Sequence, residues 1–108
     1  MVDFVRVKIY EISMLGYENY KKQNRLVLLF KVLSNANRFK IINFLAGCGN
    51  DGATFGQIAR FLNISETNLS NHLRLMRISK VIKARQQGNF MHYSIADILA
   101  IKLISVMD

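Results

Sequence analysis

The segment Ser65–Arg77 constrains the fold of this 108-residue chain more than any other part. Ser65 is a good N-cap residue, because its hydroxyl can accept a hydrogen bond from a free backbone N–H of a first helical turn. The negative charge of Glu66 suits the positive end of a helix dipole. The apolar residues recur at the spacing of one helical face, at Leu69, Leu73 and Met76. The pattern predicts a short helix with one apolar side.

The other side of this predicted helix carries short hydrogen-bonding side chains and guanidinium groups, which are Thr67, Asn68, Ser70, Asn71, Arg74 and Arg77. Side chains of these types reach base edges and phosphates when a helix lies in the major groove of DNA. An ordinary solvated helix face has a similar composition, so this segment alone does not distinguish the two interpretations.

The charge distribution favours the DNA interpretation. The chain has 15 Lys and Arg against 7 Asp and Glu, a net charge of +8. Residues 54–95 contain six basic residues and one acidic residue, a balance of +5. A basic segment of this kind is typical of a DNA-facing surface. We therefore expect double-stranded DNA as a partner.

Length and apolar content predict one folded domain that associates with itself. A chain of 108 residues fits a single domain. Hydrophobic residues make up 51% of it, which argues against disorder and exceeds what the core of a small monomer uses. We expect the excess to be buried in a homodimer interface.

Neither a membrane segment nor a secretion signal is expected, because no apolar run approaches the ~18 residues of a membrane span and the N-terminus lacks a cleavage-site pattern. The single cysteine, Cys48, cannot form an internal disulfide. These features predict a cytoplasmic protein without a membrane partner. Cys48 is interpreted as an idle thiol, with cross-linking to a second chain as the alternative.

The N-terminal third is predicted to be helical. Residues 1–14 fit a strand or a helix, and we favour a helix because the rest of the chain is helical. Residues 17–33 form a helix whose apolar face is wide enough to pack on two sides. Residues 34–37 end this helix and cap the next, which covers 38–46 and stops at the glycine-rich residues 47–52.

The central residues predict a helix-turn-helix. Thr54 and Gln57 have the spacing of a capping box, so a helix begins at Thr54. Residues 62–64 form a tight turn in which Asn63 replaces the usual glycine, since asparagine tolerates positive φ. Ser65 then caps the second helix. Two short helices joined in this way, the second polar and basic on its outer face, form a DNA-binding motif.

The C-terminal third predicts a wing and a last helix. Residues 81–85 and 90–95 are short, β-branched and aromatic, and Gly88-Asn89 suits a hairpin reversal between them. Asp97 is the expected N-cap of a helix that ends at Met107. Apolar residues surround that helix almost completely, so it must be buried, and the simplest partner is a second chain.

The predicted fold is therefore mainly α with a small β-hairpin, a winged helix-turn-helix in one domain, 1–108. Residues 34–95 would be the DNA-binding core, and residues 1–33 and 97–108 would form the dimer interface. The side chains expected at that interface are Leu26, Leu29, Phe30, Leu99, Leu103 and Val106.

Two segments resemble the ArsR/SmtB repressor family. LSNANRFKIINFL, residues 33–45, resembles the family segment L-A-D-P-T-R-L-R-I-L, with Arg38 on the family arginine, Asn35 in place of the aspartate and Ala36 in place of the proline. ISETNLSNHLRLMR resembles the recognition helix S-x-x-T/N-V-S-x-H-L-x-x-L. Its matching residues, together with those of the wing, are Ser65, Asn68, Ser70, His72, Leu73, Gly88 and Tyr93.

The resemblance implies a homodimeric repressor that leaves a palindromic operator when an inducer, often a metal ion, binds. The metal motifs of the family are absent. Thr54 and Gly56 stand where metal-sensing members have cysteines, and Leu99 stands where others have a histidine two residues after the aspartate, here Asp97. His72, His92 and Cys48 fall on three different elements, whereas zinc needs three or four converging donors. We expect no metal and no cofactor, and either an unknown inducer or a constitutive repressor.

The residues expected to contact DNA have different roles. Thr67, Asn68 and Asn71 would lie nearest the bases, whereas Ser70, Arg74 and Arg77 would hold phosphates. His72 is interpreted as either a phosphate contact or a half-buried helix residue. The wing residues expected at the backbone or the minor groove are Lys83, Arg85, Gln87 and Asn89.

The sequence predicts no enzyme, because it contains no paired-carboxylate, Ser-His-Asp or phosphate-loop pattern. The alternative functions are a winged-helix module for protein or RNA contact, and a DNA-binding component of a larger assembly without an inducer.

Overall fold

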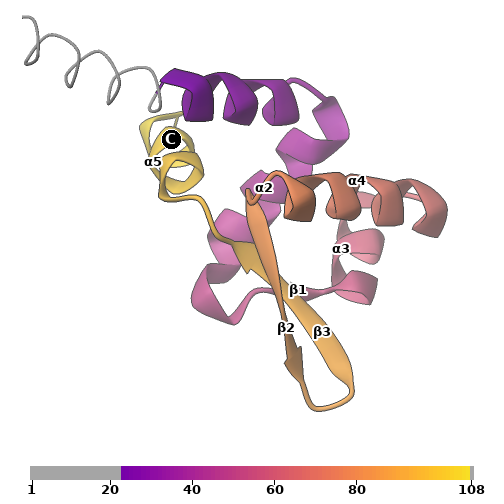
Figure 1. Cartoon of the computed structure of the whole chain (residues 1–108). Coiled ribbons are helices and arrows are strands. Elements are labelled where there is room, and N and C mark those ends of the chain that lie inside the picture. Colours follow the sequence, from indigo (N-terminus) through magenta and orange to yellow (C-terminus); the bar gives the residue numbers. More distant parts are fainter. Residues whose placement is uncertain (1–22, 108) are drawn as a thin grey trace, which may run out of the picture.

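The computed structural model describes residues 23–107, and the expected helix over residues 1–14 lies outside this range. The described chain begins with a helical segment, residues 23–33, within the helix predicted over 17–33. In Figure 1 this indigo segment lies beside α5, Ile98–Met107, at the end of the molecule opposite the hairpin tip. The segment 23–33 and α5 are therefore neighbours within one protomer, whereas the sequence led us to expect α5 to pack against a second chain.

Helix α2, Ala36–Cys48, starts two residues earlier and ends two residues later than predicted. Its N-cap is Asn35, whose Oδ1 accepts hydrogen bonds from the backbone N–H groups of Asn37 and Arg38 at 3.0 and 3.2 Å. The last two residues of the predicted cap segment 34–37 are thus already helical. A 3₁₀ turn, Gly49–Asp51, follows α2.

The helix-turn-helix consists of α3, Phe55–Leu62, and α4, Glu66–Ile78. The capping box at the start of α3 is present in both directions. The Gln57 N–H donates to the Thr54 hydroxyl at 3.2 Å, and the Thr54 N–H donates to Gln57 Oε1 at 2.9 Å. Asn63 ends α3 in the left-handed conformation, with φ +52° and ψ +49°. The predicted turn chemistry is therefore confirmed.

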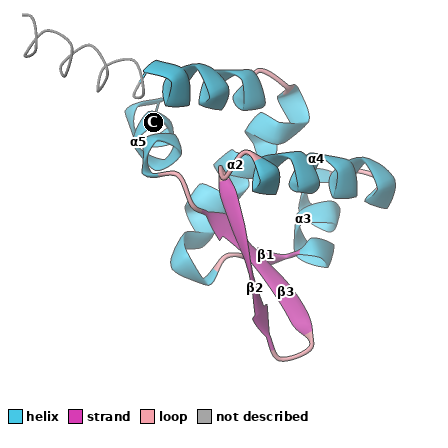
Figure 2. Ribbon diagram, in the orientation of Figure 1, coloured by secondary structure: helices cyan, strands magenta, loops and turns pink. Residues whose placement is uncertain are grey.

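The wing is formed by β2, Ile82–Gln87, and β3, Phe90–Ile95, which pair antiparallel (Figure 2). Gly88 has φ +62° in the reversal between them. Sequence analysis missed a third strand, β1, Ala53–Thr54, which pairs with β3 so that the sheet order is β1-β3-β2. β1 links the wing directly to the start of α3.

The core lies around α2, between the helical segment 23–33, the helices α3, α4 and α5, and the base of the sheet. Its buried apolar side chains are Leu29, Val32, Leu33, Ile41, Ile42, Leu45, Ala53, Ile58, Leu69, Leu73, Met76, Val81, Ile82, Ala100 and Ile104. The Arg38 Nε donates to the carbonyl of Val32 at 2.7 Å, which ties α2 to the end of the preceding helix. Within residues 23–107, no helix is both long and apolar enough to cross a membrane.

Candidate nucleic-acid interface

Helix α4 presents a polar face because its apolar face is fixed in the core. The Ser65 hydroxyl accepts a hydrogen bond from the Asn68 N–H at 3.3 Å, which confirms the predicted N-cap. Leu69, Leu73 and Met76 are buried. The side chains predicted to contact bases or phosphates are consequently exposed, namely Thr67, Asn68, Ser70, Asn71, Arg74 and Arg77.

His72 lies at the edge of this face and is half-buried. Burial, and then the positive charge of Arg38, lowers the pKa of His72 below its ordinary value of 6.5. The fold therefore favours the neutral imidazole over the charged form. This state fits the half-buried interpretation better than a fixed positive contact to phosphate.

The wing carries its polar residues at alternating positions of β2. Lys83, Arg85 and Gln87 are exposed and share one face of the strand, because successive side chains of a strand point to opposite sides. The Arg85 Nη2 donates to Gln87 Oε1 at 3.2 Å. Asn89 is exposed in the turn. The wing therefore offers a second basic and polar surface beside α4.

The basic side chains of α4 and the wing form no ion pairs with other side chains among residues 23–107. The ion pair found among residues 23–107 joins Arg25 to Asp97 at 3.7 Å, and neither residue belongs to α4 or to the strands of the wing. Within the described range, Arg74, Arg77, Lys83 and Arg85 thus have no carboxylate partner and can attract a polyanion.

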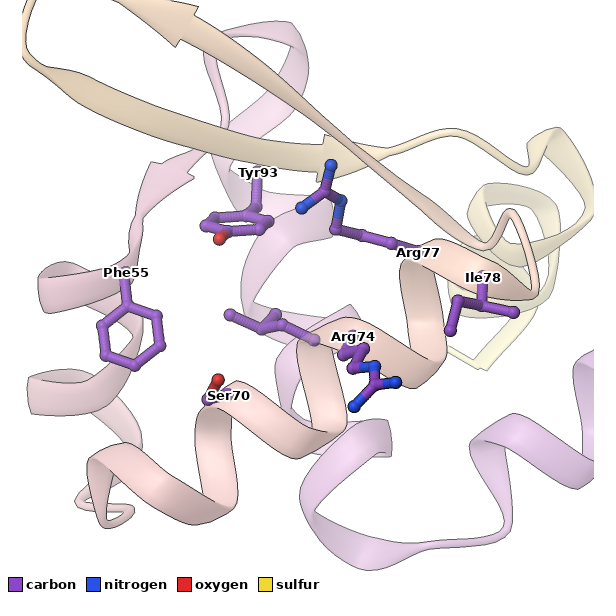
Figure 3. Close-up of a pocket in the computed structure, with 7 residues that line it drawn as sticks. Phe55, Ser70, Arg74, Arg77, Ile78 and Tyr93 are labelled. Atoms are coloured by element: carbon purple, nitrogen blue, oxygen red, sulfur yellow. The ribbon is translucent and has the colours of Figure 1, made fainter.

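Sequence analysis missed a pocket between α4, the start of α3 and β3 (Figure 3). We call it the arginine pocket, and its lining residues are Phe55, Ser70, Leu73, Arg74, Arg77, Ile78 and Tyr93. Phe55 and Tyr93 carried no sequence signal for a shared site, because the pairing of β1 with β3 brings their elements together.

The residues weighed as metal ligands remain on separate elements, with Cys48 at the end of α2, His72 on α4 and His92 on β3. Burial raises the pKa of the Cys48 thiol, which favours the protonated form at neutral pH. His92 Nδ1 is buried and has no hydrogen-bond partner among the described residues.

The arrangement is that of a winged helix-turn-helix DNA-binding protein. Residues 35–82 match the family described as bacterial regulatory protein, arsR family. The chain is 36% identical over 67 residues to the transcriptional repressor SdpR of Bacillus subtilis, covering 62% of this chain and 71% of that protein. The chain belongs to the ArsR family and is a DNA-binding transcriptional regulator rather than an enzyme.

Solved structures share the fold. The transcriptional repressor PagR of Bacillus anthracis is 28% identical, with a TM-score of 0.73 and coverage of 82% of this chain and 99% of that one. The homodimeric winged helix-turn-helix domain of a possible ArsR-family regulator from Mycobacterium bovis is 21% identical, with a TM-score of 0.69 and coverage of 82% and 80%. The family and the fold predicted from sequence are therefore confirmed.

Proposed function

We propose that this chain is a homodimeric repressor that binds a palindromic operator, with α4 in the major groove and the β2–β3 wing along the backbone. The observation that carries the proposal is the exposed polar and basic face of α4, which has no carboxylate partner within residues 23–107 and is held outward by three buried apolar residues. Two-fold symmetry would place the two half-sites roughly 34 Å apart, one helical turn of DNA.

The residues of α4 divide by reach and chemistry. Asn68 and Asn71 can each form a bidentate pair with adenine, and Thr67 can contact a base edge. The Ser65 cap uses only the backbone N–H of Asn68, so the amide side chain stays free for DNA. Ser70, Arg74 and Arg77 hold phosphates, and Lys83, Arg85, Gln87 and Asn89 extend these contacts to the wing.

Homodimerisation is supported by apolar side chains that stay exposed on the helical segment 23–33 and on α5. Phe30 is 53% exposed and Val106 is 83% exposed, and both were predicted at the interface. Leu26, Leu99 and Leu103 are half-buried. Leu29, which was also predicted at the interface, is only 1% exposed and belongs to the protomer core, so it offers no surface to a second chain. The M. bovis relative with this fold is itself homodimeric.

The test is binding to the chain's own upstream DNA and to random duplex over a salt series. We expect selective binding with a steep log–log salt dependence. Arg74→Gln should weaken binding to both duplexes and flatten the slope by roughly 1.8, because the homodimer loses two phosphate contacts, whereas Asn71→Ala should mainly reduce selectivity. Lys40→Gln, at an exposed lysine of α2 outside α4, the wing and the proposed dimer interface, is the matched control and should change neither quantity.

Two results would contradict the proposal. Equal, weak binding to both duplexes would favour a winged helix used for protein or RNA contact. An unchanged salt slope in Arg74→Gln would mean that the basic face of α4 is solvated rather than bound to phosphate.

A further inference from the structure

The arginine pocket is a preformed hollow of about 570 Å³ on the DNA-facing side of the molecule. Figure 3 shows Phe55 on α3 and Tyr93 on β3, with the Arg77 side chain extending from α4 beside Tyr93, whereas the Arg74 guanidinium points away from both rings. Ser70 and Arg74 also line the pocket from α4. Ligand sites of proteins have volumes of roughly 300 to 1,000 Å³ and combine apolar walls with a few converging polar groups. The arginine pocket matches this description.

Its walls are mainly apolar. The buried side chain of Leu73 forms part of the lining, the rings of Phe55 and Tyr93 are half-buried, and Ile78 is exposed at the C-terminal end of α4. A DNA phosphate needs hydrogen-bond donors and gains little from such walls. A flat apolar group would instead be removed from water between these walls, and the burial of its apolar surface would favour binding.

The polar groups of the pocket all suit an anion. Ser70, Arg74 and Arg77 recur at the spacing of one helical face and all line the pocket, and the Arg77 guanidinium is the one that lies beside the Tyr93 ring (Figure 3). The lining contains no acidic residue, and neither arginine has a carboxylate partner within residues 23–107. Guanidinium groups bind carboxylates through paired, charge-assisted hydrogen bonds.

We propose that the arginine pocket binds a small organic anion with a flat apolar body and an acidic group, and that its occupation excludes DNA. The anion engages the same Ser70, Arg74 and Arg77 that the proposed function assigns to phosphates, so this inference rests on that function. A ligand that competes with the operator relieves repression, and by linkage DNA weakens ligand binding by the same factor.

The direct test is calorimetric titration of the full chain, without DNA, with 2-naphthoate as the probe. We expect one site per protomer with a dissociation constant below about 1 mM, the range reached by ligands of this size. The uncharged 2-naphthamide should bind at least about tenfold more weakly, because it lacks the charge-assisted bonds. This arm needs no DNA, so its failure is separable from a failure of operator binding.

Variants locate the probe. Phe55→Ala removes an apolar wall that has no assigned DNA contact, and Arg77→Gln removes the charge. Each should weaken 2-naphthoate binding by about tenfold. Arg60→Gln, an exposed arginine of α3 outside the pocket, is the matched control and should leave binding unchanged. Circular dichroism of each variant checks that the fold is retained.

A competition experiment tests the second part of the proposal, that the bound anion excludes DNA. With 2-naphthoate at ten times its dissociation constant, the apparent dissociation constant for DNA should rise by about 100-fold at constant ionic strength, because the homodimer must vacate two pockets and each contributes a factor of about ten. Inorganic phosphate at the same concentration should have little effect, since it cannot use the apolar walls. Equal displacement by phosphate, equal binding of the amide, or insensitivity to Phe55→Ala would each overturn the site. Probe binding that leaves DNA affinity unchanged would overturn the competition.

Discussion

Gly52 lies where the chain enters β1, with φ +69° and ψ −158°, a region that essentially only glycine adopts. A Cβ at this position would also overlap the main-chain carbonyl of Tyr93 on β3. Backbone conformation and close approach therefore both require glycine. This residue allows β1 to pair with β3, and so it fixes the wing relative to α3 and the arginine pocket.

Gly52→Ala should reduce the free energy of unfolding by about 3 kcal/mol or more, since conformational strain and a clash with rigid backbone each cost about 1–3 kcal/mol. Gly49→Ala is the matched control. Gly49 has a similar conformation, φ +65° and ψ −151°, but no atom within 4 Å of an added Cβ. It should lose only the strain, about 1–3 kcal/mol. Urea unfolding measures both, and equal losses would show that the contact with Tyr93 is unimportant.

His72 gives the protein a pH-dependent stability. Its pKa is lowered in the folded state by burial and by Arg38, so between the folded and unfolded pKa values the unfolded chain binds more protons. Stability is therefore full above the ordinary value of 6.5 and falls as the pH drops below it. Urea unfolding at pH 5.5 and 7.5 should show a smaller difference for His72→Gln than for the native chain.

The same pair of proteins separates the two interpretations of His72. A phosphate contact would favour the charged imidazole in the complex, so DNA affinity would rise on acidification more in the native chain than in His72→Gln. A half-buried structural residue gives both proteins the same pH dependence of affinity. In Arg38→Ala, NMR titration should show the pKa of His72 moving up toward 6.5, because one of its two causes is removed.

At the scale of elements, the turn between α3 and α4 sets how the DNA-binding helix is presented. Asn63 occupies it in the left-handed conformation, which costs most L-residues roughly 1–2 kcal/mol and asparagine less. Asn63→Ala should therefore lower the free energy of unfolding by about 1 kcal/mol, whereas Asn63→Gly should leave it nearly unchanged. A loss in Asn63→Gly as large as in Asn63→Ala would mean that the amide side chain, rather than the backbone conformation, matters.

Local signals made α3 and α4 predictable. The caps at Thr54 and Ser65, the turn residue Asn63 and the apolar spacing of α4 are all contained within a few residues, and each appears in the structure. The polar face of α4 followed from the same spacing. These features need no knowledge of distant parts of the chain.

Features that depend on distant contacts were missed. β1 has only two residues, and it is a strand because β3, some 40 residues further on, pairs with it. Leu29 and Phe30 both belong to the apolar face predicted for the helix 17–33, so the sequence pattern does not tell them apart. The position of the core does, because Leu29 is 1% exposed and Phe30 is 53% exposed. The arginine pocket needs three elements to meet, so no single segment contains it.

At the scale of the whole molecule, the exposed apolar side chains of segment 23–33 and α5 lie close together, because these elements are neighbours (Figure 1). The Arg25–Asp97 ion pair, at 3.7 Å, links the two elements within one protomer. Apolar surface gathered at one end, opposite the wing, suits a two-fold interface that leaves both copies of α4 free for DNA.

The double variant Phe30→Glu, Val106→Glu should therefore be monomeric. Both side chains are largely exposed in the protomer, so the protomer keeps its fold, whereas the dimer would have to bury unpaired carboxylates. Sedimentation velocity should show half the native mass, and operator affinity should fall by about 100-fold or more as two linked half-site contacts become independent. Phe90→Glu, at an equally exposed aromatic residue of the wing, is the control for association and should remain dimeric. A dimer of undiminished stability in the double variant would place the interface on another surface of the molecule.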